Sequence, residues 1–121
     1  MSTLLEVELL GLPPTLNQMY RNHGHYRYKR GTTAAYQQYA TARLREEWGG
    51  KAAYDGRVKL SVILRTSDKR RWDIDNRVKA LQDCLSMAGV IEDDSQIDEL
   101  YVKRERSSTS STYVALKASE S

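Results

Sequence analysis

Residues 58–89 read VKLSVILRTSDKRRWDIDNRVKALQDCLSMAG, and this stretch predicts a strand, a basic loop and a helix in direct succession. Val58, Leu60, Val62 and Leu64 alternate with Lys59, Ser61, Ile63 and Arg65, as in a strand with one buried face. We expect the basic loop at 66–72 and a helix from about Ile74 to Ala88, which Gly89 ends. The end of a strand is a rigid place from which to present a functional site.

Acidic residues stand directly beside the basic residues of this loop. Asp73 and Asp75 follow Lys69, Arg70 and Arg71. Carboxylates repel the phosphates that a basic surface attracts, and they become useful there when divalent cations lie between the two. A third carboxylate, Asp94, can return to a neighbouring sheet edge after the helix ends.

Each of these residues also has a purely structural interpretation. Asp73 is well placed to be a helix N-cap. The same carboxylate can serve both as a helix cap and as a metal ligand. Asp75 and Lys79 are four residues apart and can form an exposed salt bridge worth about 0.3 to 0.5 kcal/mol. A calcium loop of the EF-hand type is excluded, because Arg77 and Val78 break its ligand spacing.

The remaining elements complete a mixed α/β fold. Alternating residues predict a strand at 4–10, and Thr32 or Thr33 can cap a helix that runs to about Trp48. Segments 96–105 and 112–118 predict a hairpin around a serine-rich turn. We therefore expect a single domain over residues 1–121, a mixed sheet covered by two main helices.

Composition limits the classes of protein. The net charge is +3, the pI is about 9.0, and the one cysteine, Cys84, excludes an internal disulfide framework and a cysteine zinc site. No apolar run approaches membrane-spanning length, and the first residues do not resemble an ordinary signal peptide. We expect a cytoplasmic protein with no membrane partner and no small-molecule cofactor.

A second basic cluster precedes the first helix. Tyrosines alternate with basic residues over 20–30, where aromatic faces can stack on unpaired bases and cations can meet phosphates. A solvated loop anchored by its tyrosines is an equally good interpretation. His23 and His25 offer a weaker alternative, as the acid and base of a metal-independent ribonuclease or as metal ligands.

Residues 70–97, RRWDIDNRVKALQDCLSMAGVIEDDSQI, resemble the signature of the RusA family of Holliday junction resolvases. The shared pattern contains basic residues, D-x-D-N, a lysine, D-x-L, a small residue with glycine, D-D, and glutamine before an apolar residue. The resemblance extends to Pro13 and Pro14, to the residues that follow them, and to the closing strands. Leu16 and Trp72 depart from the pattern, which bears on junction affinity or sequence preference.

The resemblance implies a dimeric, Mg²⁺-dependent endonuclease, with Mn²⁺ as a substitute, that cuts branched DNA at four-way junctions by paired nicks. Metal ligands would be Asp73, Asp75 and Asp94, and Lys79 would be the catalytic lysine beside these three. The residues expected to contact DNA come from both basic clusters: Asn17, Gln18, Tyr20, Arg21, Arg27, Lys29, Arg30, Lys69, Arg70, Arg71 and Asn76.

Two further considerations concern the assembly and the alternative function. A four-way junction has two-fold symmetry, so matched nicks require two matched sites, which a homodimer supplies. The alternative is a catalytically inactive protein that binds junctions and remodels or blocks branched DNA. The complete acidic set argues against that alternative.

Overall fold

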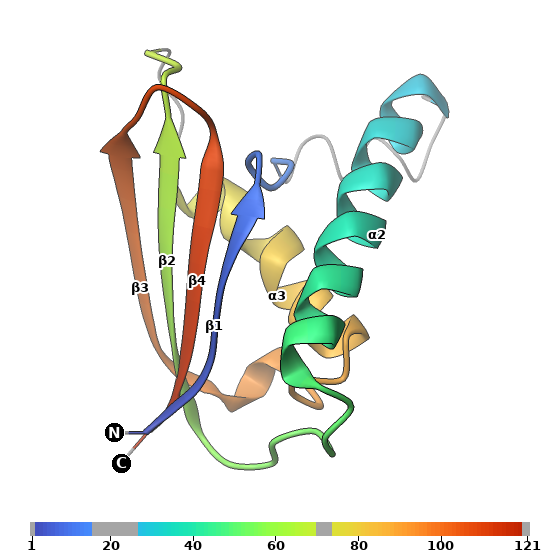
Figure 1. The fold of residues 1–121 in the computed structure, drawn as a ribbon, viewed down its shortest axis with the longest axis vertical. Coiled ribbons are helices and arrows are strands. Elements are labelled where there is room, and N and C mark those ends of the chain that lie inside the picture. Colours follow the sequence, from blue (N-terminus) through green and yellow to red (C-terminus); the bar gives the residue numbers. More distant parts are fainter. Residues whose placement is uncertain (1, 16–26, 70–73, 120–121) are drawn as a thin grey trace.

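The computed structural model describes residues 2–15, 27–69 and 74–119, which form one sheet and a layer of helices on one of its faces (Figure 1). The sheet has four strands in the order β1-β4-β2-β3. In chain order the elements are β1 Thr3–Leu10, α2 Arg27–Trp48, β2 Val58–Thr66, the 3₁₀ helix η1 Ile74–Arg77, α3 Val78–Met87, the 3₁₀ helix η2 Asp94–Gln96, β3 Ile97–Arg106 and β4 Ser111–Ala118. The expected mixed sheet with two main helices is confirmed.

Strand β2 occupies the interior of the sheet. It pairs in parallel with β3 and antiparallel with β4, so the predicted hairpin of β3 and β4 is wrong. The connection between them crosses the end of β2, where the Ser107 amide donates to the Thr66 carbonyl over 3.2 Å (Figure 1). Every second residue of β2 is buried, which suits a strand with neighbours on both sides, whereas no residue of β3 is fully buried, which suits an edge strand.

The hydrophobic core lies between the sheet and the two helices. The alternating residues of β1 and β2 point into it as predicted, and so does the expected stripe of α3. Val90 and Ile91, after the helix, are also buried. The main core residues are Leu5, Val7, Leu9, Ala40, Leu44, Trp48, Val58, Leu60, Val62, Leu64, Leu81, Cys84, Leu85, Val114 and Leu116.

Both helices begin elsewhere than predicted. Helix α2 starts at Arg27, not at Thr32 or Thr33, and so continues through Gly31. A single glycine inside a helix costs only about 1 kcal/mol and need not end it. The segment predicted as one helix from Ile74 begins as the 3₁₀ turn η1, and α3 follows with Arg77 at its N-cap. The cap predicted at Asp73 lies outside the described residues. Gly49 and Gly89, both at positive φ, end the helices as expected.

In the described ranges, no helix combines the length and the apolar character that crossing a membrane would require.

Candidate active site

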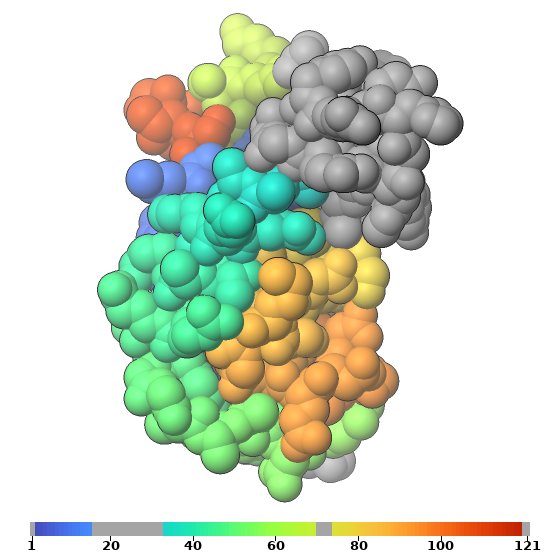
Figure 2. All heavy atoms as spheres, turned by 90° about the vertical axis from the view of Figure 1, so that its right-hand side faces the viewer, coloured from blue at the N-terminus to red at the C-terminus, as the bar shows by residue number. Residues whose placement is uncertain are grey.

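Lys79, near the start of α3, joins two carboxylates from different elements. Its Nζ lies 2.9 Å from Asp94 Oδ2 and 3.0 Å from Asp83 Oδ1. Asp83 is one helical turn further along α3, so the two side chains share a face. Asp94 is the first residue of η2, which reaches the same face after the chain turns at Gly89. Figure 2 shows α3 and the segment around 92–96 side by side on one surface.

The two carboxylates keep the lysine charged. Hydrogen bonds to Asp94 and then to Asp83 raise the pKa of Lys79 well above its ordinary value, against the small opposing effect of burial. Because the lysine side chain is 44% exposed, solvent and salt screen these ion pairs. The contacts therefore fix the position of an ammonium group more than they stabilise the fold.

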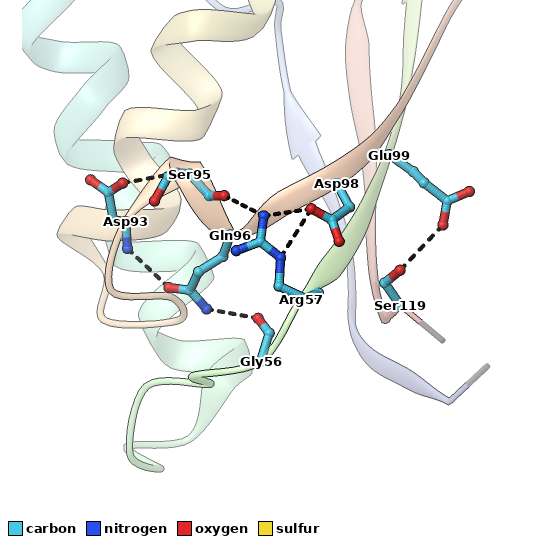
Figure 3. Close-up of polar contacts among 8 residues, drawn as sticks. All are labelled: Gly56, Arg57, Asp93, Ser95, Gln96, Asp98, Glu99 and Ser119. Carbon is cyan, nitrogen blue, oxygen red and sulfur yellow. Dashed lines mark hydrogen bonds and ion pairs between the residues drawn. The ribbon is translucent and has the colours of Figure 1, made fainter. Parts of the chain in front are cut away.

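Asp94 owes its position to the turn that carries it. The neighbouring Asp93 is the N-cap of η2, and its Oδ2 accepts from the Ser95 amide over 2.9 Å (Figure 3). The Gln96 side chain completes a reciprocal capping box by accepting from the Asp93 amide over 3.0 Å. Two side chains thus hold the short helix on which Asp94 stands.

Gln96 also ties this turn to the loop before β2. Its Oε1 accepts from the Glu92 and Asp93 amides, and its Nε2 donates to the carbonyls of Tyr54, over 2.7 Å, and Gly56, over 3.0 Å. The contacts to Asp93 and Gly56 can be followed in Figure 3. Gln96 is buried, and all four partners are backbone groups. Burial of a fully satisfied amide makes the geometry of the turn specific.

Arg57, directly before β2, fastens the other side of the turn. Its guanidinium donates to the Ser95 carbonyl over 2.7 Å and to Asp98 Oδ1 (Figure 3). Arg57 therefore connects the end of η2 with the start of β3. The turn that carries Asp94 is therefore hydrogen-bonded to the loop at 54–56 through Gln96 and to Arg57 through the Ser95 carbonyl.

An open pocket of about 320 Å³ adjoins the Lys79 cluster. Its lining comes from α2, α3 and the turn at 92–94, and four of the lining residues are acidic. The residues are Gln37, Lys79, Asp83, Ser86, Met87, Glu92, Asp93 and Asp94. A pocket lined by carboxylate oxygens favours hard cations such as Mg²⁺.

The structure brings part of the predicted site together. Asp94 and Lys79 are in direct contact, whereas Asp75 lies exposed on η1. Within the described residues the ion pairs of Lys79 are with Asp83 and Asp94, so the salt bridge considered between Asp75 and Lys79 is wrong. A 3₁₀ turn at 74–77 does not place residues 75 and 79 as neighbours on one α-helical face.

Several predicted site residues cannot be compared in this way. Asp73, Asn17, Gln18, Tyr20, Arg21, Arg70 and Arg71 lie outside the described residues, as do His23, His25, Leu16 and Trp72. Arg27, Lys29 and Arg30 belong to the first turn of α2. Lys69 is exposed in the loop after β2, and Asn76 is half-buried in η1.

The donor chemistry of this surface fits a divalent cation. Asp94 supplies carboxylate oxygens, one of which pairs with the Lys79 ammonium group, and Asp75 on η1 supplies an exposed carboxylate. Within ranges 2–15, 27–69 and 74–119, no three His, Cys, Asp or Glu side chains are close enough to hold a metal ion. Asp73, the remaining predicted metal ligand, lies outside those ranges.

Sequence reasoning missed two residues of this surface. Asp83 was part of the D-x-L pattern without a role, although its spacing of four from Lys79 on a helix signals a contact. Gln96 was read only as a motif residue, and its role depends on the distant loop at 54–56. Sequence spacing can indicate a contact between two residues one helical turn apart, but not a contact with a loop that is distant in the sequence.

Comparison with known proteins places the chain among the endodeoxyribonucleases. A sequence model described as endodeoxyribonuclease RusA matches residues 11–117. The chain is 34% identical over 99 residues to a crossover junction endodeoxyribonuclease of Enterobacteria phage HK97, covering 79% of both chains. It is 33% identical over 98 residues to the crossover junction endodeoxyribonuclease RusA of Aquifex aeolicus (strain VF5), covering 80% of this chain and 77% of the relative. The chain belongs to the RusA family.

Proposed function

We propose that this protein is a divalent-metal-dependent endodeoxyribonuclease that resolves four-way DNA junctions by paired nicks in opposite strands. Membership of the RusA family supports the reaction and the substrate. The observation that carries the proposal is the contact of Lys79 with Asp94 at the rim of an acid-lined pocket. The cellular setting would be recombination and repair of DNA, or phage DNA processing, in the cytoplasm.

Asp73, Asp75 and Asp94 would hold Mg²⁺, or Mn²⁺ in its place, and no small-molecule cofactor is needed. When bound, the ion would supply charge neutralisation at the scissile phosphate and lower the pKa of an attacking water. The protein contributes the placement of the carboxylates: Asp94 on a turn fixed by Asp93 and Gln96, and Asp75 on η1. Precise placement matters because ligands on rigid elements need no reorganisation during the reaction.

Lys79 would act on the phosphate as a fixed positive charge. Its pKa is raised by Asp94 and Asp83, so the ammonium remains charged at neutral pH. A charged donor held near the scissile group stabilises negative charge that develops in the transition state. Asp83 would keep the ammonium on α3 when Asp94 binds a cation.

The basic residues would bring the DNA backbone to this surface. Lys69, Arg70, Arg71 and Asn76 flank the acidic residues in sequence, and Arg27, Lys29 and Arg30 belong to the start of α2. Tyr20, Arg21, Asn17 and Gln18 complete the proposed DNA-binding set. Cations of this kind neutralise phosphates and release counterions, so binding should weaken as the salt concentration rises.

A synthetic four-way junction tests the proposal. The wild-type protein should cut it in Mg²⁺ or Mn²⁺ and not in EDTA, while Asp75→Asn should bind the junction and fail to cut it. Equal cleavage by both proteins would exclude a role for Asp75. Binding without cleavage by the wild type in several metals would favour the inactive junction-binding alternative, and cleavage that persists in EDTA would favour the histidine-based ribonuclease chemistry.

A further inference from the structure

Arg77, between η1 and α3, is unfavourable for the helix that it precedes. It is the N-cap of α3, but its side chain makes no capping hydrogen bond. Arginine is not among the preferred N-cap residues, and a cation at this end of a helix meets the positive end of the helix dipole. A residue that conflicts with its own helix indicates a role elsewhere in the fold.

The side chain of Arg77 reaches the segment that follows β1. Its Nη1 donates to the Pro13 carbonyl over 2.7 Å, although 64 positions separate the two residues. The end of β1 and the start of α3 lie toward the same end of the molecule (Figure 1). Arg77 is half-buried and Pro13 is buried. A hydrogen bond from a charged donor is among the stronger ones in proteins, and partial burial reduces its screening by water.

The segment that carries this carbonyl is fixed by other contacts. The Gly11 amide donates to the Ser110 carbonyl over 3.0 Å, and the Gly11 carbonyl accepts from the Thr112 hydroxyl over 2.8 Å. Pro13 and Pro14 are buried, and consecutive prolines restrict the backbone to extended conformations. The Pro13 carbonyl is therefore a rigidly placed acceptor.

The 3₁₀ helix η1 has less support of its own. It has four residues, Ile74–Arg77, and none of them is buried. Because hydrogen-bond geometry in 3₁₀ turns is poor, the position of η1 depends on contacts with its surroundings. Ile74 packs against the core at the start of η1, and the bond from Arg77 holds its end. Asp75 lies between these two anchors.

We propose that Arg77 is a positioning residue for strand cleavage, because its bond to the Pro13 carbonyl holds η1 on the fixed segment after β1 and so places the Asp75 carboxylate. This inference rests on the proposed function, in which Asp75 holds a divalent cation. Groups that orient a metal ligand matter for the metal site, and their loss typically costs about 10- to 100-fold in metal affinity or activity.

Two substitutions separate positioning from folding. Arg77→Met removes the donor and keeps an aliphatic side chain. Arg77→Asn removes the same bond, because its side chain is much shorter, but gives α3 a favoured N-cap residue. At a saturating concentration of a four-way junction and equal Mg²⁺, both variants should nick about 10- to 100-fold more slowly than the wild type. In urea, Arg77→Asn should be the more stable of the two, although it is equally slow.

Thr112→Val is the matched control. It removes the buried hydroxyl that bonds the Gly11 carbonyl on the same segment, and it leaves the bond between Arg77 and Pro13 in place. It should lower stability in urea but nick the saturating junction at the wild-type rate. Arg77→Lys should recover part of the lost rate, since an ammonium group can donate to the carbonyl but lacks the planar fork of arginine.

Binding of Mn²⁺ to the protein without DNA gives a second readout that does not need cleavage. Electron paramagnetic resonance of free Mn²⁺ measures the affinity in a titration. Arg77→Met and Arg77→Asn should weaken Mn²⁺ binding about 10-fold or more, and Thr112→Val should leave it unchanged.

The outcomes separate the positioning role from the function. Wild-type nicking rates in both Arg77 variants, or rates that follow stability in all variants including Thr112→Val, would overturn the positioning role and leave junction cleavage intact. A wild type that binds Mn²⁺ but cuts no junction would overturn the proposed function alone, and weaker Mn²⁺ binding by the Arg77 variants would still support the positioning role. A wild type that neither binds Mn²⁺ nor cuts would overturn both.

Discussion

Lys79 Nζ lies 2.9 Å from Asp94 Oδ2, so one ion pair joins helix α3 to the short turn that precedes β3. The two residues are 15 positions apart and belong to elements that meet only through the fold. The contact brings a fixed cation to a carboxylate suited to metal binding, and the experiments below ask what each neighbour of this pair contributes.

Asp83 should act through Lys79. We expect Asp83→Asn to slow junction nicking about 5- to 30-fold, since the lysine loses the partner that holds it on α3, and to have no added effect once Lys79→Met is present. The coupling in this cycle should be about 1 to 2 kcal/mol. Single-turnover nicking rates of the wild type, the two single variants and the double variant measure this coupling. Glu92→Gln, which removes an exposed acid from the same pocket, is the matched control. Additive effects of the two substitutions would rule out action through the lysine.

Gln96 should stabilise the fold as well as the site. Gln96→Ala leaves four part-buried backbone groups without their side-chain partner, and we expect a loss of about 2 to 4 kcal/mol in the free energy of unfolding. Urea denaturation measures it. Gln82→Ala on α3, a half-buried position, should change stability by less than about 0.5 kcal/mol. Equal effects of the two substitutions would mean that the turn is not held by this amide.

The Asp93 cap should show a characteristic dependence on pH. Hydrogen bonds from the Ser95 hydroxyl and amide lower the pKa of Asp93. A lowered folded-state pKa means that the contribution is present above the unfolded carboxyl pKa and is lost as the pH falls through the folded value. Asp93→Ala should therefore reduce stability at neutral pH, because the cap of η2 is lost, and should reduce it by less in acid.

Urea unfolding of both proteins at neutral pH and at about pH 3 measures this difference. Asp93→Asn is the control, because asparagine is an equally good cap without a charge that titrates. A stability difference between wild type and Asp93→Ala that is unchanged in acid would contradict the assigned hydrogen bonds.

Much of this fold could be predicted from periodicity alone, because β1 and β2 each bury every second residue and α3 buries one stripe. The position of β3 could not. Because β3 and β4 are close in sequence and joined by a serine-rich turn, the sequence suggested that they form a hairpin. In the structure β2 lies between them, where its fully apolar inner face is buried. Competition between strands for the central position depends on the whole sheet, and a local pattern does not record it.

The site was predictable to a similar extent. Lys79 and Asp94, two of the predicted site residues, are in contact, whereas no contact shown for the described residues joins Asp75 to them, and its role as a metal ligand stays a prediction. The identity of the helical partner was wrong, since a 3₁₀ turn replaces the first turn of the expected helix and Asp83 takes the place given to Asp75. Helix type over four residues is a small energy difference that sequence rules do not resolve.

The start of α2 should contribute to DNA affinity through charge. Replacing Arg27, Lys29 and Arg30 by alanine should weaken junction binding and reduce the slope of log K against log salt by about 1 for each residue that contacts a phosphate. Titrations at several salt concentrations provide the slope. Lys59→Ala with Lys117→Ala, neighbours on β2 and β4, is the control on the face without helices. An unchanged slope in the triple variant would remove these residues from the interface.

The most direct measurement compares nicking and binding of a four-way junction by the wild type, Asp94→Asn and Glu92→Gln, in Mg²⁺, on a sequencing gel. The wild type and Glu92→Gln should make paired, symmetric nicks. Asp94→Asn should bind as tightly but cut at least about 100-fold more slowly, since even second-shell partners of a metal cost about 10- to 100-fold. Cleavage by Asp94→Asn at the wild-type rate would contradict the assignment of the Lys79 and Asp94 surface as the site of the reaction.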